Sequence, residues 1–462
     1  MNDDTSSKLT ISPGRLEKKF ADYKPLYTES EALIEANRCL NCYDAPCISA
    51  CPTGIDIPAF IKKIATGNII GSAKVIFEAN MLGYSTGRVC PVEDLCVGAC
   101  VYNDLNYSPI QIGRLQRYAT EKALEKEVST GKKLFPRNSR KSEKKVALIG
   151  AGPASLACAA YLALDGVEAV IFEKDGLPGG LNTMAVAPYK FQTEDSINEA
   201  NWILQHGVEL KIGIEIGKDI SLEQLIDEYD AVFIGIGLGT DSRLDLPGSA
   251  GPGVWGATDL IRQIKNNPDF SLPEDLNTAL VIGGGNTAID ISRELAMLGA
   301  EDVRMLYRRS RKEMRGYDHE IVGASHYGVR LVENVTPLEV VRHGKKVKAL
   351  KVSSTISDDT FELPCDWVVE AVGQLKHVSD VSPEIEVDEM GRLIVDSETR
   401  RTAHPKVYAG GDCINGGKEV VNAAQDGREA AFDILKSWGI SPSLHGKKYF
   451  KSFLHIMGIR RT

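Results

Sequence analysis

The sequence predicts an α/β fold with two Rossmann-like units, preceded by an all-α domain that is rich in cysteine. A β-branched apolar run followed by glycines and an alanine-rich helix pattern occurs at Val146–Leu164. A second strand, glycine and helix pattern occurs at Ala279–Asp290. Strands that pass through a glycine turn into a helix are typical of parallel sheets in α/β domains. Seven of the ten cysteines lie in the first hundred residues, before either pattern.

The early cysteines form two runs whose spacing indicates iron-sulfur clusters. The first run reads C-x2-C-x4-C-x3-C-P and the second has three members: Cys39, Cys42, Cys47 and Cys51, then Cys90, Cys96 and Cys100. Thiolates bind [4Fe-4S] clusters in groups of four, and ferredoxin-type runs often send their fourth cysteine to the other cluster. We therefore expect Cys51 to join Cys90 and Cys96, with Cys100 completing the first cluster. Two [4Fe-4S] clusters have eight ligand positions, but the two runs supply only seven thiolates. Either one ligand is not a cysteine, or one cluster is smaller or incomplete.

Zinc and disulfides are the alternatives for these cysteines. Structural zinc sites use C-x2-C pairs but rarely continue with the x4-C-x3-C-P spacing. Disulfides require an oxidising compartment, whereas the start MNDDTSSK has no basic region followed by an apolar stretch. A reducing, cytoplasmic location is expected.

Composition and charge restrict the class of protein and the kinds of partner that the sequence is compatible with. Hydrophobic content of 43% with 25% charged residues indicates a globular protein, and a net charge of −9 argues against nucleic acid as a partner. The uncharged stretch Val146–Leu164 is long enough to span a membrane, but its Gly-Ala-Gly-Pro turn argues against this. No membrane association is expected.

The first glycine loop has the features of a dinucleotide site. Gly150 would permit the tight turn, Gly152 would let the backbone approach a pyrophosphate, and the following helix would direct its N–H groups at the phosphates. The next apolar run ends at Glu173, about twenty residues on, where a carboxylate would accept hydrogen bonds from a ribose. Ser155 replaces the third glycine, which should push helix and strand slightly apart.

A glycine-rich element near the end of the chain, Lys406–Gly417, contains an Asp after two glycines and precedes a helix pattern. In two-dinucleotide flavoenzymes, such an aspartate binds the ribitol of FAD. With the small residues of Pro178–Thr183, these features predict an FAD site made of Gly150, Gly152, Pro153, Ala154, Ser155, Glu173, Lys174, Gly180, Leu181, Gly411 and Asp412.

The second glycine loop is expected to bind NADPH in preference to NADH. Its strand partner ends in arginines instead of the carboxylate that usually selects NAD, and guanidinium groups suit a 2′-phosphate. The alternative is a solvated basic loop with no ligand. The predicted residues are Gly283, Gly285, Asn286, Thr287, Ala288, Arg308, Arg309 and Arg315.

These assignments imply a discontinuous flavin domain with the nicotinamide domain inserted in it. We expect an α-helical cluster domain at 1–135, the first part of the FAD domain at 136–259, the NAD(P)H domain at 260–374, and the rest of the FAD domain with the C-terminal tail at 375–462.

Several motifs together resemble the N-terminal half of dihydropyrimidine dehydrogenase over nearly the whole chain. They are CLNCYDAPC, CPTGIDIPAFI, GRVCPVEDLCVGAC, PIQIGRLQRYATE, the GAGPAS loop and EKDGLPGGLNT. The resemblance implies Cys39, Cys42, Cys47 and Cys100 for one [4Fe-4S] cluster, and Cys51, Cys90, Cys96 and Gln116 for the other. The residues alone do not choose Gln116 over Gln111.

The resemblance also implies a function and a partner. Nothing in the chain corresponds to the FMN barrel of the full-length enzyme. This favours the electron-input subunit of a two-subunit dihydropyrimidine dehydrogenase, in a hetero-oligomer with an FMN-containing large subunit that reduces uracil and thymine. No catalytic side chain is required, because cofactors transfer the hydride and the electrons. The alternatives are a glutamate synthase small subunit, or a related NADPH-dependent electron donor, and a metal-binding scaffold without redox function.

Overall fold

The computed structural model describes residues 11–136, 141–381 and 385–444. The chain forms two compact units, and each consists of segments that are far apart in the sequence. Of the described residues, the smaller unit contains those within 11–23, 181–196 and 238–377, and the larger unit contains those within 24–180, 197–237 and 378–444. The 445–462 part of the expected C-terminal tail lies outside the described residues.

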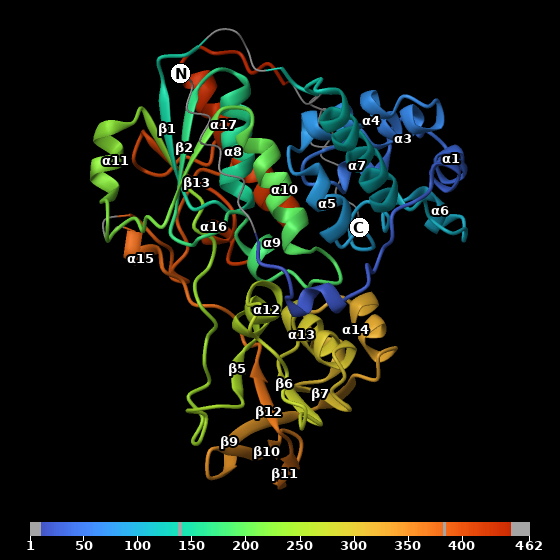
Figure 1. Cartoon of the computed structure of the whole chain (residues 1–462), viewed down its shortest axis with the longest axis vertical. Helices are drawn as coiled ribbons and strands as arrows, with labels where there is room; N and C mark the ends of the chain where they lie inside the picture. The colour runs from blue at the N-terminus through green and yellow to red at the C-terminus, as the bar shows by residue number, and fades with distance from the viewer. Residues whose placement is uncertain (1–10, 137–140, 382–384, 445–462) are drawn as a thin grey trace, which may run out of the picture. The chain divides into compact units, whose positions relative to one another are not determined.

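The larger unit begins with a group of helices joined by the cysteine-bearing loops (Figure 1). The helices are α1 (Glu29–Asn37), α2 (Pro46–Ser49), α3 (Ile57–Ala65), α4 (Ile69–Ala79), α5 (Gly83–Val89), α6 (Val101–Asp104) and α7 (Ile112–Thr130). Side chains fix where several of them start. Thr28 and Glu31 form a capping box on α1, and Asp56 accepts from the backbone N–H of Ala59 at the start of α3. An apolar core that includes Phe60, Ile61 and the cysteine loops holds the helices together.

The second part of the larger unit is a parallel five-stranded sheet in the order β13-β4-β1-β2-β3. Its strands are β1 (Lys145–Ile149), β2 (Glu168–Glu173), β3 (Val208–Ile212), β4 (Ala231–Ile234) and β13 (Val407–Ala409). The helices α8 (Pro153–Leu164), α10 (Thr193–Leu204) and α17 (Val420–Ser437) cover one face, and α11 (Leu222–Glu228) covers the other (Figure 1). Two short helices, α15 (Val378–Val381) and α16 (Asp412–Asn415), complete this part.

Residues of the helical part and the sheet part contact each other within the larger unit. Arg428 on α17 donates to the carbonyl oxygens of Thr53 and Ala79, at 2.9 and 2.6 Å. The rings of Phe77 and Trp202 lie 4.6 Å apart between centroids. These contacts join the cysteine-bearing helices to the sheet in one compact body.

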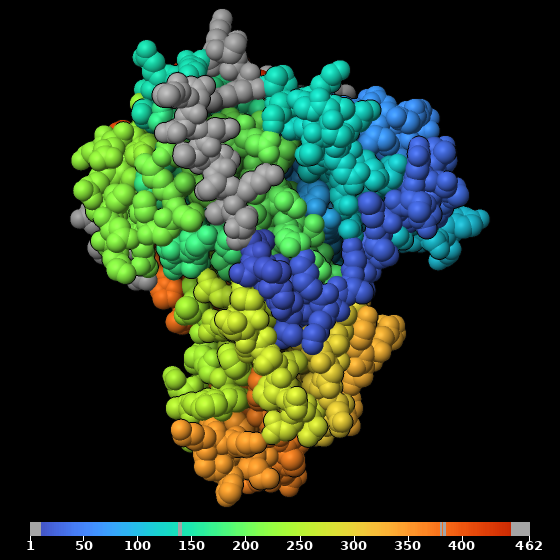
Figure 2. Space-filling view, viewed as in Figure 1, coloured from blue at the N-terminus to red at the C-terminus, as the bar shows by residue number. Residues whose placement is uncertain are grey.

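The smaller unit contains a second parallel sheet in the order β5-β12-β6-β7-β8 and an antiparallel sheet in the order β11-β10-β9. The strands are β5 (Val254–Gly256), β6 (Thr278–Ile282), β7 (Asp302–Tyr307), β8 (Arg330–Glu333), β9 (Val335–His343), β10 (Lys346–Ser354), β11 (Thr360–Pro364) and β12 (Trp367–Glu370). Its helices are η1 (Leu16–Lys19), α9 (Leu181–Met184), α12 (Ala257–Asn266), α13 (Asn286–Met297), η2 (Arg311–Glu313) and α14 (Asp318–Ser325). In Figure 2 the blue residues around η1 lie on the surface of this unit, against α12.

The predicted fold class is confirmed: helices come first, and two parallel Rossmann-like sheets follow. The two ends of the inserted segment lie side by side, because Asp241 near its start and Gln374 near its end form an antiparallel bridge. The compact unit takes in 238–377, including β5, whereas the sequence placed the domain at 260–374. The expected domain limits remain predictions. Among the described helices, none combines the length and the apolar composition that a membrane span requires.

Candidate functional site

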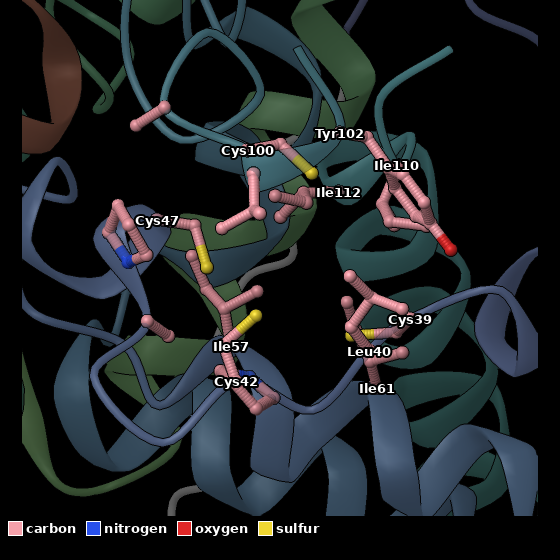
Figure 3. Close-up of a pocket in the computed structure, with 15 residues that line it drawn as sticks. Cys39, Leu40, Cys42, Cys47, Ile57, Ile61, Cys100, Tyr102, Ile110 and Ile112 are labelled. Atoms are coloured by element: carbon pink, nitrogen blue, oxygen red, sulfur yellow. The ribbon is translucent and has the colours of Figure 1, made fainter. Parts of the chain in front are cut away.

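Four cysteines line one pocket in the helical part of the larger unit (Figure 3). Cys39 and Cys42 lie in the loop before α2, Cys47 lies in α2, and Cys100 is the residue before α6. The sulfur atoms point toward a common space whose remaining wall is apolar, with Ile57, Ile61, Ile110 and Ile112 among its residues. The structure thus brings together the four cysteines that were predicted to share one cluster.

The electrostatics of this pocket oppose free thiolates. Burial raises the pKa of Cys47 to about 12, and the negative charges of Cys39, Cys100 and Cys42 add to the effect. Burial likewise raises the pKa of Cys39, with further contributions from Cys42 and Cys100. A positively charged metal core would reverse this penalty, because thiolates are the form that binds metal. Four partly buried soft donors around one space fit an iron-sulfur cluster.

The remaining three early cysteines form a second group. Burial raises the pKa of Cys90 far above its ordinary value, and the charges of Cys96 and Cys51 raise it further. Burial also raises the pKa of Cys96, with Cys51 as the largest electrostatic neighbour and Cys47 of the first group next. The described residues contain no three His, Cys, Asp or Glu side chains close enough together to hold one metal ion.

Gln116 lies on α7, where this helix packs against α5. Its side-chain nitrogen donates to the carbonyl oxygen of Gly83 at 2.8 Å and to the hydroxyl of Thr86 at 3.0 Å. A Cβ on Gly87 would lie 3.0 Å from the backbone nitrogen of Arg117, so this glycine permits the close approach of the two helices. The two hydrogen bonds use the amide nitrogen, so the carbonyl oxygen would be the ligating atom. The role of Gln116, like that of the cysteines, remains a prediction.

The first glycine loop is shaped by close backbone contacts. Gly150 has φ of +84°, and a Cβ there would lie 2.8 Å from the carbonyl oxygen of Gly235. Gly180 has φ of +54°, and a Cβ there would lie 2.9 Å from Cα of Gly152. Gly152 is the residue before α8, so the N-terminus of this helix opens at the loop. This narrow backbone cradle fits the pyrophosphate of a dinucleotide.

Glu173 lies at the end of β2, as expected, and is buried. Its two carboxylate oxygens accept from the backbone N–H groups of Ala151 and Asp175, at 2.6 and 2.8 Å. Burial raises the pKa of this carboxyl, and the two backbone hydrogen bonds oppose the rise. Each oxygen keeps acceptor capacity for a ribose hydroxyl. Lys174 is exposed beside it, and Pro153, Ala154 and Leu181 follow the two glycine loops.

Ser155 does not act only as a spacer between helix and strand. A Cβ on Gly235 would lie only 2.2 Å from the hydroxyl oxygen of Ser155. Because Gly235, directly after β4, has no side chain, it leaves space for the side chain of Ser155. In the usual motif, a third glycine in the loop itself leaves this space. The sequence analysis did not predict that Gly235 contacts the first glycine loop, although a glycine directly after an apolar strand is a recognisable pattern.

Asp412 begins α16 after Gly411, whose φ is +80°. Burial raises the pKa of Asp412, and its carboxylate accepts from the backbone N–H of Lys418 at 3.0 Å. Asp426 on α17 supports the turn, because it accepts from the N–H of Gly411 at 2.9 Å and pairs with Arg400 at 2.8 Å. No sequence signal distinguished Asp426 from other acidic helix residues.

Glu419 connects the flavin-type site and the second cysteine group. This residue precedes α17, and its charge acts on both Asp412 and Cys90. Both groups are therefore within electrostatic reach of this carboxylate. The sequence alone could not show this, because more than three hundred residues separate Cys90 from Glu419.

The second glycine loop precedes α13 in the smaller unit. A Cβ on Gly283 would lie 2.4 Å from the carbonyl oxygen of Ala371, and Gly285 is the residue before the helix. Asn286 accepts from the backbone N–H of Tyr317 at 3.0 Å. Thr287 is exposed and Ala288 is buried in the first turn.

The predicted arginines lie on the loop that follows β7. Arg308, Arg309 and Arg315 are exposed, and Arg309 lies 3.9 Å from Glu313. The backbone N–H of Arg315 donates to the carbonyl oxygen of Gly284 at 3.1 Å, which ties the basic loop to the glycine loop. The structure thus places the three arginines on a segment adjoining the nucleotide cradle. This arrangement suits a 2′-phosphate.

Family comparison agrees with this division of the chain. A model described as dihydropyrimidine dehydrogenase domain II, 4Fe-4S cluster, matches residues 16–128. A model of the pyridine nucleotide-disulphide oxidoreductases matches residues 144–427, more than half of the chain. The chain belongs to this family. It is an NAD(P)H-dependent flavin and iron-sulfur oxidoreductase.

Relatives of this oxidoreductase include glutamate synthase small chains and subunits of dihydropyrimidine dehydrogenase. The glutamate synthase [NADPH] small chain of Escherichia coli K12 is 33% identical over 445 residues, which cover 90% of this chain and 93% of the relative. The NAD-dependent dihydropyrimidine dehydrogenase subunit PreT of E. coli O157:H7 is 35% identical over 408 residues, which cover 88% of this chain and 94% of the relative. These matches confirm the resemblance that the motifs indicated.

Solved structures share the two-sheet fold of this oxidoreductase. Thioredoxin reductase of T. acidophilum has a TM-score of 0.53 at 21% identity and covers 64% of this chain and 99% of its own. FprA of Mycobacterium tuberculosis in complex with NADPH has a TM-score of 0.53 at 19% identity and covers 65% of this chain and 85% of its own. At this identity the likeness concerns the fold alone.

Proposed function

We propose that this chain is the electron-input subunit of a two-subunit dihydropyrimidine dehydrogenase. It would take a hydride from NADPH or NADH and pass electrons to an FMN-containing partner subunit that reduces uracil or thymine to the 5,6-dihydropyrimidine. The observation that carries the electron-transfer role is the pair of cysteine groups beside a flavin-type cradle in one compact unit. The relatives named PreT and the motifs around the cysteines support the choice of partner.

The residues proposed to hold the clusters are the two groups described above. Cys39, Cys42, Cys47 and Cys100 would hold one [4Fe-4S] cluster, and Cys51, Cys90, Cys96 and Gln116 would hold the other. When bound, the flavin exchanges two electrons with the nicotinamide and the clusters carry electrons singly. The chain itself would supply the sulfur ligands, the amide oxygen and the apolar surroundings that set the cluster potentials.

The order proposed for the two clusters rests on a contact of α17, the helix that follows the Asp412 turn. Arg428 on this helix donates to the carbonyl oxygen of Thr53, two residues after Cys51, so the cluster at Cys51, Cys90 and Cys96 would be the first to receive electrons from the flavin site. The neighbourhood of Cys96 and Cys47 would then connect it to the other cluster.

A glutamate synthase small subunit is the second candidate. Its support is the 33% identity to that chain in E. coli, which extends over 445 residues against 408 for PreT. In that case the same cradle and clusters would deliver electrons to a partner that forms glutamate.

The two candidates differ in the partner and its substrate. The test is to isolate the holoprotein anaerobically with its native partner, and to follow oxidation of NADPH and NADH with uracil or with glutamine plus 2-oxoglutarate. Uracil-dependent oxidation with an FMN-containing partner is the expected result. Oxidation that requires glutamine and 2-oxoglutarate would replace the first candidate by the second.

We also propose NADPH as the preferred nicotinamide, on the three exposed arginines beside the glycine loop. Replacing Arg308 and Arg315 together by Ala should raise the KM for NADPH roughly tenfold or more, because each guanidinium–phosphate contact is charge-assisted. The KM for NADH should stay within about twofold, since NADH lacks the 2′-phosphate. Lys312→Ala, an exposed cation of the same loop, serves as the control. Equal effects on both nicotinamides would contradict NADPH selection.

A further inference from the structure

A cavity of about 590 Å³ lies on the smaller unit, outside the nucleotide loop and the cysteine groups. Its walls come from α13, α14, Tyr189 and the N-terminal segment at 21–23. The volume falls in the range of about 300–1,000 Å³ that is common for small-molecule sites. Arg293, on its wall, lies seven residues along α13 from Asn286, or roughly 10 Å along the helix axis. The cavity is thus separate from the glycine loop at the start of the helix.

Arg293 is held in a cage of three aromatic rings. Its guanidinium carbon lies 4.3 Å from the ring centre of Tyr23, 4.4 Å from that of Tyr189 and 4.7 Å from that of Tyr327. The residue is only 2% exposed. Gly323 on α14 leaves room for it, since a Cβ there would lie 3.2 Å from the Nη1 atom of Arg293. Three ring faces around one cation fix the position of the guanidinium.

The caged guanidinium keeps donors that the described residues do not satisfy. Both Nε and Nη1 of Arg293 are buried without a hydrogen-bond acceptor. The nearest acceptor, Oε2 of Glu320, lies 3.9 Å from Nη1, beyond hydrogen-bond distance, and is itself buried without a hydrogen-bond partner, whereas Oε1 lies 2.8 Å from Nζ of Lys190. Asp290 is likewise engaged, because it accepts from both Tyr189 and Lys190 at 2.7 Å. Burying donors without acceptors costs about 1–3 kcal/mol each, and more for a charged group.

The rim of the cavity is aromatic, with two imidazoles and one carboxylate, that of Asp22. His319 lies in the first turn of α14 and His326 directly follows its last residue, seven positions on, which places both on the same side of the helix. Tyr23, Tyr189 and Tyr327 offer ring surface around the single buried cation. An anion would satisfy the Arg293 donors, and a planar group attached to it could pack on the tyrosines.

We infer that this cavity binds a small organic anion in which a carboxylate or phosphate group is joined to a planar ring. Arg293 holds the anionic group, and the tyrosine rings contact the planar part. The site is independent of the proposed electron-transfer function, because it uses none of the cluster, flavin or nicotinamide residues.

The test uses the anaerobic holoprotein with saturating NADP⁺, so that the nucleotide site is filled. Benzoate, phenyl phosphate and, as a neutral analogue, benzyl alcohol are titrated by calorimetry. We expect one saturable site for benzoate or for phenyl phosphate and none for benzyl alcohol. The anion that binds more tightly identifies the class as carboxylate or phosphate. Absence of binding by both anions, or equal binding of benzyl alcohol, would overturn the inference.

Two further measurements locate the site. Arg293→Gln should weaken binding of the anion at least tenfold, whereas Arg330→Gln, an exposed arginine of the same unit, should leave it unchanged. In the wild-type protein, which needs no altered core, the anion should protect His326 from carbethoxylation by diethyl pyrocarbonate, measured by mass spectrometry. Binding that leaves His326 unprotected and is insensitive to Arg293→Gln would show that the anion binds elsewhere and overturn the assignment.

Discussion

At the scale of single residues, hydrogen bonds hold the side-chain amide of Gln116 in place. Both hydrogen bonds of its amide nitrogen are made to α5, one of them to Thr86, only four residues before Cys90. A side chain that is only 7% exposed and held in this way loses little further rotamer freedom when its oxygen binds a metal. The neighbouring Gln111 lies at the start of α7 instead, where its backbone N–H donates to Glu35 at 2.8 Å.

Replacing Gln116 by Ala should alter the electron paramagnetic resonance signal of one reduced cluster and leave the other unchanged. Loss of a ligand or of its support commonly costs roughly 10- to 100-fold in metal affinity or activity. We therefore expect at least tenfold slower reduction of the partner, with unchanged NAD(P)H-dependent reduction of ferricyanide. Gln116→Glu, which keeps an oxygen donor, should retain the cluster, and Gln111→Ala is the matched control. An unchanged signal and rate in Gln116→Ala would remove Gln116 from the ligand set.

A second residue-scale effect concerns Glu199 on α10. Its buried carboxylate accepts from the backbone N–H of Ser85 at 2.9 Å, at the start of α5. Burial raises the pKa of Glu199 from the ordinary value of 4.5 to about 7, although the hydrogen bond from Ser85 opposes the rise. The folded protein therefore binds more protons than the unfolded chain between these two values. The contribution of Glu199 to stability is full below pH 4.5 and is lost as the pH rises through 7.

Glu199→Gln should remove this loss, because glutamine stays neutral. The apparent Tm of the variant should exceed that of the wild type at pH 8 and approach it as the pH falls below 4.5. Linkage limits the difference to on the order of 3 kcal/mol. Glu228→Gln, on the exposed surface of α11, should change neither value. Parallel Tm-versus-pH curves for wild type and Glu199→Gln would show that Glu199 does not titrate as described.

At the scale of secondary-structure elements, the start of α8 shows how one loop depends on a strand far along the chain. Ser155 on α8 and Gly235 after β4 share a space that fits only one side chain. A Cβ on Gly235 would also lie 3.1 Å from the ring of Phe233. The position of the glycine cradle relative to the sheet is set by this contact, because interiors are packed without spare volume.

Gly235→Ala should therefore displace α8 and weaken FAD retention, with a loss of stability of about 1–3 kcal/mol from overpacking. The double variant Gly235→Ala with Ser155→Gly should recover most of both, because it returns the glycine to the helix side of the contact. The flavin content after gel filtration and the apparent Tm measure the two effects. Gly176→Ala, where a Cβ meets no atom within 4 Å, is the control. Failure of Ser155→Gly to rescue would show that the two residues do not compete for space.

The same elements show what the sequence could predict. The glycine loops, the carboxylate at the end of β2 and the cysteine runs are local patterns, since each lies within about thirty residues of chain and follows known spacings. Gly235, Asp426 and Glu419 act through contacts across the fold, and their residue types are common at such places. Local spacing carries no information about these long-range contacts. Arg293 was missed for the same reason, because its three tyrosines come from three separate segments.

At the scale of the whole molecule, the larger unit joins the cysteine-bearing helices and the flavin-type sheet, and electron transfer between them requires a fixed separation. Arg428 on α17 holds this junction through the carbonyl oxygens of Thr53 and Ala79. Thr53 follows Cys51 by two residues, and its hydroxyl lies 3.4 Å from the sulfur of Cys51. The same helix begins next to the Asp412 turn. Arg428 thus connects the helix at the flavin-type site to the loop of the second cysteine group.

Arg428→Met should keep both cofactor types but loosen this junction, because methionine retains the apolar stem and loses both hydrogen bonds. Each bond to a charged group contributes about 1.5–3 kcal/mol, so the apparent Tm should fall measurably. In stopped-flow experiments with NAD(P)H, flavin reduction should keep its wild-type rate, whereas the subsequent reduction of the clusters should slow. Lys436→Met, an exposed cation of α17, should change neither rate. If cluster reduction in Arg428→Met were as fast as in the wild type, while the Tm fell, this contact would stabilise the unit without setting the path of the electrons.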